Sequence, residues 1–205
     1  MNERARKQDL KRAAILDAAG AVFAERGFAA ATTLHIASAA HVSKRDIYAL
    51  FGSKEGVLHA VVRRGMDSMA APITPGPAVT RAEFLATLRD FAEAFLARLL
   101  DPAMLALYRL AIAEAPQSPE LGRTLGETAT GAVNEAVRVY VLAAQEASLV
   151  DFPDPGLALA AFFGVLLGGL QLRVLLNPAQ SLPPETIRNR ASRAMAVLAE
   201  LDRNK

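Results

Sequence analysis

Residues 32–51 read TTLHIASAAHVSKRDIYALF, and this stretch decides the fold of the amino-terminal part of the chain. Thr32 and Ser43 each precede a short run whose apolar residues have helical spacing. A hydroxyl at such a position accepts a hydrogen bond from an exposed backbone N–H of the first helical turn. Two short helices are therefore predicted, one after Thr32 and one after Ser43.

The spacing within this stretch is typical of a helix-turn-helix. Ala37 stands four residues before His41, and Ile47 stands six residues after it. The small side chain lets the two helices approach each other, and the apolar side chain fills the space between them. We therefore expect a helix-turn-helix whose second helix enters the major groove of DNA.

A further helix is predicted before this pair, from about Lys11 to Arg26. Ile15 and Val22 belong to an apolar stripe on one of its faces, and Gly27 is placed to end it. Residues 1–53 are thus predicted to form a three-helix DNA-binding domain, and residues 54–205 a second helical domain.

The composition favours an all-α protein. Hydrophobic residues make up 52% of the 205 residues, Ala and Leu dominate them, and helical spacing recurs along most of the chain, which predicts about nine helices in total. There is no cysteine, which excludes disulfides and thiolate metal sites. The charged start MNERARKQDLKR has no apolar run behind it, so we expect no secretory signal peptide and a cytoplasmic protein.

The charge is unevenly distributed along the chain. Residues 1–65 carry 11 Lys and Arg against 6 Asp and Glu, whereas residues 66–205 carry 12 against 15. Cations concentrated on a small module suit a polyanionic partner such as DNA, because neutralised phosphates release condensed counterions. A solvated basic face has the same composition, so charge alone leaves both readings open.

The amino-terminal third resembles the DNA-binding domain of the tetracycline-repressor (TetR) family. Three stretches carry the resemblance: FAERGF at 23–28, the segment quoted above, and GSKEGVLHAV at 52–61. The matching pattern comprises Phe23, Gly27, Phe28, Ile36, Ala37, Val42, Ser43, Tyr48, Phe51 and Lys54. The resemblance implies a regulator, most simply a repressor, that binds double-stranded operator DNA.

The resemblance also implies which residues contact DNA. Thr32 and Ser43 would orient their helices and touch phosphates, and Tyr48 and Lys54 would bind further phosphates. Lys44 and Arg45 lie on the first turn of the recognition helix and are expected to read base edges, since Arg can pair two acceptors of guanine. The expected DNA-binding set is Thr32, Thr33, Ser43, Lys44, Arg45, Tyr48 and Lys54.

Several positions depart from the family pattern. His41 replaces the customary turn glycine, and a left-handed backbone there costs about 1 kcal/mol or more. Arg45 replaces a small residue and Thr33 an apolar one. Asp46 is expected to pair with Arg45, or else to accept from a cytosine amino group. Upstream, Arg4, Arg6 and Lys7 are interpreted as an arm along the DNA.

The remaining helices are predicted from caps and breakers. A fourth helix follows Ser53, and Thr80 with Glu83 forms a capping box for the next. The expected ranges are 54–70, 81–100, 102–115, 118–148, 157–176 and 184–201.

The apolar segment 157–176 has three interpretations. It is barely long enough to span a membrane, but Gln171 and Arg173 interrupt it, so no membrane association is expected. It could equally be a buried core helix. The third interpretation is a dimer interface, and the resemblance favours it because such proteins form homodimers through their last two helices. The small residues expected in that interface are Ala160, Gly164 and Gly168.

The resemblance further implies a pocket for a small-molecule effector, expected to be lipophilic or aromatic, in the second domain. Polar groups on otherwise apolar helices are of the kind that orient a ligand in such a cavity. The candidates are Tyr108, Arg109, Glu114, Thr128, Asn134, Tyr140 and Gln171. Each has a local structural interpretation as well.

Catalytic and cofactor motifs are missing from the sequence. There is no cysteine nucleophile, G-x-S-x-G elbow, Walker motif or dinucleotide glycine pattern. His35, His41 and His59 lack metal-ligand spacing, and His35 and His59 are expected to have structural or surface roles. We therefore expect neither an enzyme nor a bound cofactor or metal. A DNA-binding dimer without an effector remains the alternative function.

Overall fold

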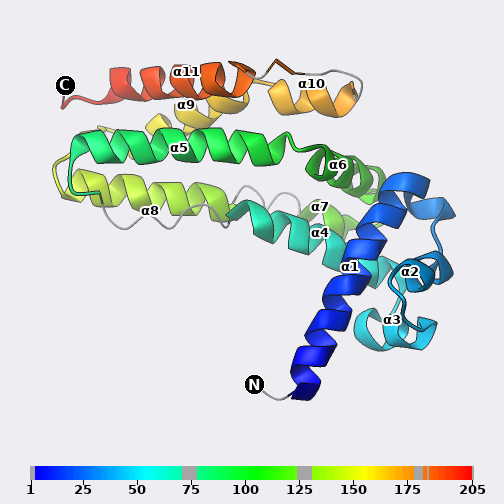
Figure 1. Ribbon diagram of the computed structural model, residues 1–205. Coiled ribbons are helices and arrows are strands. Elements are labelled where there is room, and N and C mark those ends of the chain that lie inside the picture. The colour runs from blue at the N-terminus through cyan, green and yellow to red at the C-terminus, as the bar shows by residue number, and fades with distance from the viewer. Residues whose placement is uncertain (1–2, 71–77, 124–130, 178–181, 184, 205) are drawn as a thin grey trace. The chain divides into compact units, whose positions relative to one another are not determined.

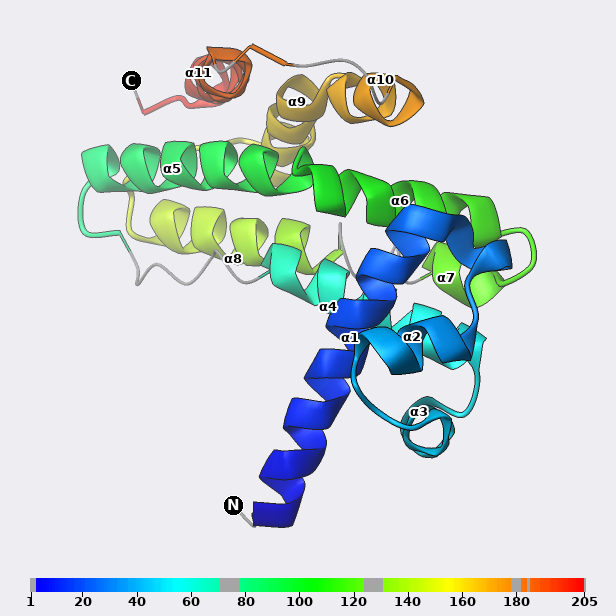
Figure 2. The same ribbon diagram turned by 45° about the vertical axis from the view of Figure 1, so that its right-hand side comes forward.

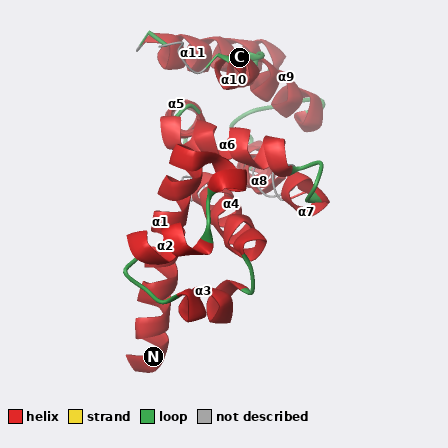
Figure 3. Cartoon of the chain, turned by 90° about the vertical axis from the view of Figure 1, so that its right-hand side faces the viewer, coloured by secondary structure: helices red, strands yellow, loops and turns green. Residues whose placement is uncertain are grey.

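The computed structural model describes residues 3–70, 78–123, 131–177, 182–183 and 185–204, and its regular elements there are all helices (Figure 3). The all-α prediction is confirmed. The chain forms two compact units, one of Met1–Ser68 with Ala106–Thr128 and the other of Met69–Leu105 with Ala129–Lys205. The predicted boundary after residue 53 falls inside the first unit and remains a prediction about which residues serve DNA binding.

The first unit contains the helix-turn-helix. Its core is built from apolar side chains that are fully or almost fully buried, among them Ile15, Phe23, Ile36, Ile47 and Leu58. Its helices, drawn in blue and cyan in Figure 1 up to α4 and in green for α6 and α7, are α1 (Glu3–Ala30), α2 (Thr33–Ala39), α3 (Lys44–Phe51), α4 (Lys54–Ala70), α6 (Pro102–Glu114) and α7 (Pro119–Arg123). Residues 69–70 of α4 and 102–105 of α6 belong to the second unit.

Helix α1 is longer than predicted. Gly27 has non-helical angles (φ 70°, ψ 164°) and kinks it as expected, but helical backbone resumes up to Ala30. At the other end α1 begins at Glu3. Arg6 and Lys7 are therefore exposed residues of a helix, and a DNA-contacting arm at these positions remains a prediction.

The second unit contains α5 (Arg81–Leu99), α8 (Ala132–Glu146), α9 (Pro155–Leu167), α10 (Leu170–Leu176) and α11 (Glu185–Leu201). Helices α5 and α8 lie side by side (Figures 1 and 2), joined by the stacked rings of Phe84 and Tyr140 with centroids 5.3 Å apart. Helix α9 packs against α11 and α5. The Thr80 hydroxyl accepts from Glu83 N at 3.2 Å, which confirms the predicted capping box.

One helix predicted as continuous is divided. The segment 118–148 includes α7 and α8, and residues 124–130 between them lie outside the described part. The segment 157–176 breaks at Gly168 and Gly169, whose φ angles are 40° and 71°. This left-handed backbone suits glycine and ends α9 before α10 begins.

The same break bears on the membrane interpretation. Among the described residues, Pro155–Leu176 is the one segment long and apolar enough to span a membrane by length and composition. The break leaves helices of 13 and 7 residues. At about 1.5 Å per residue, neither reaches the roughly 30 Å of a bilayer core. The segment is thus better explained as part of a helical bundle.

Candidate nucleic-acid interface

Helix α2 is fixed at its start by a reciprocal pair of hydrogen bonds. The Thr32 hydroxyl accepts from the backbone N–H of His35 at 3.2 Å, and the Thr32 N–H donates to Nδ1 of His35 at 3.3 Å. His35 thus accepts the hydrogen bond that a Glu or Gln side chain usually accepts in a capping box. The predicted N-cap is confirmed, and His35 has a structural role.

The turn between α2 and α3 uses a left-handed residue. His41 has φ 53°, the conformation that the customary glycine would adopt. Val42 N donates to Ala37 O at 3.0 Å and His41 N donates to Ser38 O at 3.3 Å, which is the Schellman pattern of a helix end. The turn therefore has the left-handed geometry that suits glycine, at a conformational cost of about 1 kcal/mol.

Helix α3 begins with a second capping box. The Ser43 hydroxyl accepts from Asp46 N at 3.1 Å, and Ser43 N donates to Oδ2 of Asp46 at 3.1 Å. Ile47, the residue after Asp46, has no exposed surface and anchors the middle of α3 in the core. The cap and the anchor together set where α3 starts and which of its faces is buried.

The partner of Asp46 differs from the one predicted. Its Oδ1 lies 2.7 Å from Nζ of Lys11 on α1, and its Oδ2 is taken by Ser43, so the predicted pairing with Arg45 is wrong. The hydrogen bond from Lys11, followed by those from Ser43, lowers the pKa of Asp46 from 3.8 to about 2. Asp46 is consequently a charged link between α1 and α3 at neutral pH.

Because Asp46 pairs with Lys11, it does not neutralise the cations on the first turn of α3. Lys44 and Arg45 are exposed and make no hydrogen bond or ion pair within the described part of the chain. Tyr48, one turn further along α3, has 52% of its surface exposed. Thr32 is also exposed and Thr33 is partly buried.

Lys54 is already engaged within the protein. Its Nζ donates to Phe28 O at 2.9 Å and to Ala31 O at 3.1 Å, and it lies 4.2 Å from the centroid of the Phe28 ring. Lys54 thus satisfies carbonyls at the end of α1. One of its three N–H donors is left for a phosphate, so the predicted phosphate contact would be shared with this structural role.

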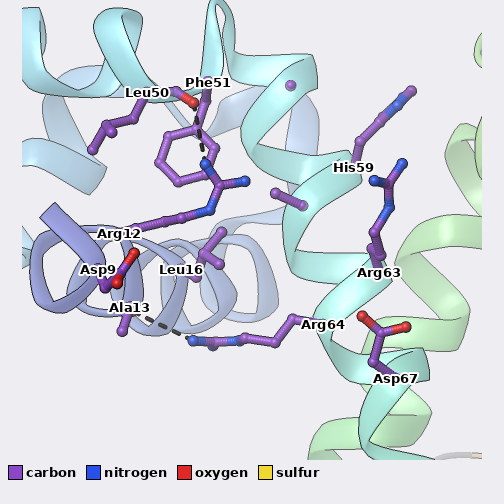
Figure 4. A pocket seen from close by; sticks show the side chains of 12 residues that line it. Asp9, Arg12, Ala13, Leu16, Leu50, Phe51, His59, Arg63, Arg64 and Asp67 are labelled. Carbon is purple, nitrogen blue, oxygen red and sulfur yellow. Dashed lines mark hydrogen bonds between the residues drawn. The ribbon is translucent and has the colours of Figure 1, made fainter. Parts of the chain in front are cut away.

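A groove of about 570 Å³ runs between α1, the end of α3 and α4. On one wall Arg12 donates to Leu50 O at 3.4 Å, and its guanidinium carbon lies 4.6 Å from the Phe51 ring centroid (Figure 4). Elsewhere Arg64 bonds Asp17 at 2.7 Å. Much of the positive charge in this groove is therefore used to join helices.

The structure distributes the predicted effector residues over both compact units. Tyr108, Arg109 and Glu114 are partly buried on α6, in the first unit; Asn134 is exposed on α8 and Gln171 partly buried on α10, in the second. Thr128 lies outside the described residues. Tyr140 is 7% exposed, and its hydroxyl has no hydrogen-bond partner in the part of the chain that is described. The three grooves described are lined by other residues.

The three small residues predicted for a dimer interface differ in environment. Ala160 and Gly164 are exposed on α9, and a Cβ added to Gly164 would meet no atom within 4 Å. Gly168 instead has φ 40°, and a Cβ there would collide with the guanidinium of Arg190. The chain's own packing therefore explains Gly168, whereas Ala160 and Gly164 have open space before them.

Lys11 and Arg12 are contacts of α3 that sequence reasoning missed. Both contact α3, yet helical periodicity places them only on the polar side of α1. The available signal was Asp46 at the third helical position, because an acid there completes a capping box and keeps one oxygen free for a cation.

Comparison with known proteins agrees with this geometry. Residues 15–61 match the model of bacterial regulatory proteins of the tetR family, and residues 86–201 match the C-terminal domain of AefR-like transcriptional repressors. No curated protein matches the chain.

Solved structures share the fold over nearly the whole length. A structure assigned to the TetR family from Mesorhizobium loti has a TM-score of 0.81 at 23% identity, over 98% of this chain and 99% of that one. A TetR regulator from Agrobacterium tumefaciens has a TM-score of 0.75 at 29% identity, over 94% of each chain. The flavonoid-responsive regulator FrrA has 0.74 at 27% identity, over 94% of this chain and 96% of that one. The chain therefore belongs to the TetR family of bacterial transcriptional regulators, with an AefR-like C-terminal domain, and is a DNA-binding regulator rather than an enzyme.

Proposed function

We propose that the chain is a dimeric transcriptional repressor that binds a palindromic operator and leaves it when a small lipophilic or aromatic molecule binds. The observation that carries the DNA-binding part is the exposed first turn of α3. Lys44 and Arg45 lie there without partners among the described residues, because Asp46 is held by Lys11. A free guanidinium can bond O6 and N7 of a guanine together.

The other predicted contacts are assigned to the phosphate backbone. Tyr48 is exposed on the same helix, and Thr32, Thr33 and Ser43 lie at the starts of α2 and α3, where backbone N–H groups favour anions. Lys54 would add a phosphate contact through its remaining donor. These contacts would set the register of α3 in the groove, and the two cations would supply the sequence preference.

Membership of the family implies dimerisation, and we assign the interface to the last two predicted helices, which correspond to α9 with α10 and to α11, with Ala160 and Gly164 on the exposed face of α9. Leu157 is 60% exposed, and Leu172 and Leu176 are 61% and 77% exposed. Residues 157, 160 and 164 share one face of α9. A second copy of the chain would cover these apolar groups and pair two recognition helices for a two-fold operator.

The effector assignment rests on Tyr140. A buried hydroxyl without a hydrogen bond costs stability, and a ligand that offers an acceptor or donor would remove that cost. The buried Phe84 ring is stacked on the Tyr140 ring, so an effector that reached the hydroxyl would enter an aromatic environment. The similar protein FrrA is described as flavonoid-responsive, which supports a planar aromatic class of effector.

Release would act through α4, which begins directly after the helix-turn-helix at Lys54 and extends to Ala70. An effector that shifts α4 would change the distance between the two recognition helices of the dimer. Both half-sites of the operator could then no longer be bound together. Since operator DNA is the partner, the site of action would be the cytoplasm.

The DNA-binding part is tested with Arg45→Ala. Operator duplexes are first selected from random-sequence DNA with the purified protein, and affinities are measured for single-base variants. We expect the substitution to remove the preference at one base pair of each half-site, by about tenfold or more. Equal weakening on every sequence would instead make Arg45 a phosphate contact.

The dimer is tested with Gly164→Leu, compared with Ala97→Leu on the exposed side of α5. The first variant should be monomeric by light scattering and the second dimeric. If an effector weakened DNA binding by the monomeric variant as strongly as by the dimer, the spacing mechanism would be wrong.

The effector is tested with Tyr140→Phe and a panel of flavonoids and other planar aromatic molecules. The variant should bind DNA normally, melt no lower than wild type because its hydroxyl has no partner, and respond more weakly. Absence of any response in wild type would favour the alternative function, a DNA-binding dimer without an effector.

A further inference from the structure

Two consecutive residues of α1 hold the two ends of the recognition helix. Lys11 contacts the first turn of α3 through Asp46, at 2.7 Å. Arg12 contacts the last turn, where it donates to Leu50 O at 3.4 Å and lies over the Phe51 ring (Figure 4).

These contacts complement the hydrophobic anchor of α3. Ile47 fixes the middle of the helix in the core, with no exposed surface. A helix of eight residues is only about 12 Å long, and one central anchor leaves it free to tilt and roll. A polar contact at each end opposes both motions.

We propose that Lys11 and Arg12 are positioning residues that set the tilt of α3, so that Lys44 and Arg45 meet base edges in the required geometry. The inference rests on the proposed role of Lys44 and Arg45 in reading bases. Bidentate contacts to a base tolerate little misorientation, whereas contacts to phosphates carry no sequence information. Loosening α3 should therefore reduce sequence discrimination more than general affinity for DNA.

The charge state of the link supports this role. The hydrogen bond from Lys11 lowers the pKa of Asp46 to about 2. The pair is consequently fully charged under all conditions in which the protein would bind DNA. Asp46 is a carboxylate beside the DNA-facing surface, so by charge alone it opposes DNA binding.

Because the negative charge of Asp46 repels DNA, Asp46→Asn separates an electrostatic role from a positioning role. Loss of a negative charge should strengthen binding to any DNA if Asp46 acts only by electrostatics. Positioning predicts the reverse for the operator: the ratio of operator affinity to scrambled-duplex affinity falls about tenfold. Asp9→Asn is the matched control, because Asp9 is an exposed α1 residue of the same charge that forms no hydrogen bond or ion pair with α3 in the described part of the chain. Its ratio should stay at the wild-type value.

Lys11→Ala tests the link from the other side and leaves the capping box of α3 intact. We expect the same fall in the affinity ratio, no additional fall in the double variant with Asp46→Asn, and recovery with Lys11→Arg. Arg12→Ala should lower the ratio through the other end of α3. Fluorescence anisotropy at several salt concentrations and a melting curve for each variant supply the measurements.

Two results would overturn the inference. The first is equal weakening on both duplexes by Lys11→Ala with a salt slope reduced by about one, which would make Lys11 a phosphate contact. The second is an unchanged ratio in Asp46→Asn, Lys11→Ala and Arg12→Ala while Arg45→Ala loses its base preference. If wild type itself prefers no sequence, it is the proposed function that fails.

Discussion

Nε2 of His59 on α4 lies 2.8 Å from the hydroxyl oxygen of Ser118, directly before α7. Nδ1 of the same ring lies 3.4 Å from Oε2 of Glu120. Residues 59 and 118–120 are far apart in sequence but belong to one compact unit. His59 therefore ties the helix that follows the helix-turn-helix to the segment around α7.

We expect Ser118→Ala to lower the free energy of unfolding by about 1 kcal/mol, the usual net value of one partly buried hydrogen bond. His59→Ala should cost at least as much, and the two losses should not add in the double variant. Chemical unfolding measures all three. Gln117→Ala, at the exposed neighbouring position, is the control and should change little. Strictly additive losses would show that the two side chains do not interact.

His41, the turn residue between α2 and α3, gives a prediction of increased stability. His41→Gly should raise the stability by about 1 kcal/mol, because φ 53° strains any residue with a Cβ. Ala40→Gly is the matched control: its φ is −85°, so glycine there should destabilise the protein. Thermal unfolding separates the two. A lower melting temperature for His41→Gly would mean that the imidazole makes a contact that outweighs the strain.

The Lys11–Asp46 link predicts a specific titration. Asp46 should titrate at about 2 in the folded protein, compared with 3.8 for an unperturbed aspartate. Because folding lowers this pKa, the carboxylate stabilises the folded state above pH 4, and that contribution is lost as the pH falls toward 2. Carbon-detected NMR follows the carboxyl group directly. In Lys11→Ala the value should move back toward 3.8; no movement would assign the low pKa to Ser43 alone.

Asp202 is the buried polar centre of the second unit. Only 2% of its surface is exposed, and its Oδ2 accepts from Arg81 at 2.9 Å. Its Oδ1 accepts from Asp151 N at 2.8 Å and from Asn204 N at 3.0 Å. These bonds join the start of α5, the loop before α9 and the chain beyond α11.

Asp202→Ala should therefore destabilise the protein by about 3 kcal/mol, because it leaves a cation and two N–H groups without their acceptor. Thermal unfolding at fixed protein concentration measures the loss, since the melting temperature of a dimer depends on concentration. Arg203→Ala, at the exposed next position, should have little effect. Similar melting temperatures for the two variants would contradict the assignment.

Local chemistry made much of the amino-terminal fold predictable. The caps at Thr32 and Ser43, the break at Gly27 and the inward side chain of Ile47 follow from hydrogen bonding and helical periodicity, which are short-range properties. The capping box at Thr80 was predictable for the same reason. In contrast, Gly168 was predicted to lie within a continuous helix, because a glycine's φ cannot be deduced from its spacing.

The candidate site was only partly predictable, since its missed contacts are long-range. Asp46 has Arg45 as its neighbour in sequence but pairs with Lys11, 35 positions away. Lys54 was predicted to bind a phosphate, yet its ammonium group already donates to backbone carbonyls at the end of α1. In both cases the sequence marks a charged group but not its partner, because the partner is set by how α1 packs against later helices.

The central claim is that the exposed first turn of α3 reads an operator, with two copies of α3 bound to one DNA. Selection of bound duplexes from random-sequence DNA, followed by hydroxyl-radical footprinting, tests it most directly. The account predicts an enriched palindrome protected at two half-sites about one helical turn, roughly 34–36 Å, apart. It also predicts that Arg45→Ala loses the preference at one base pair in each half-site. Enrichment of no sequence, or the same preference in Arg45→Ala as in wild type, would contradict it.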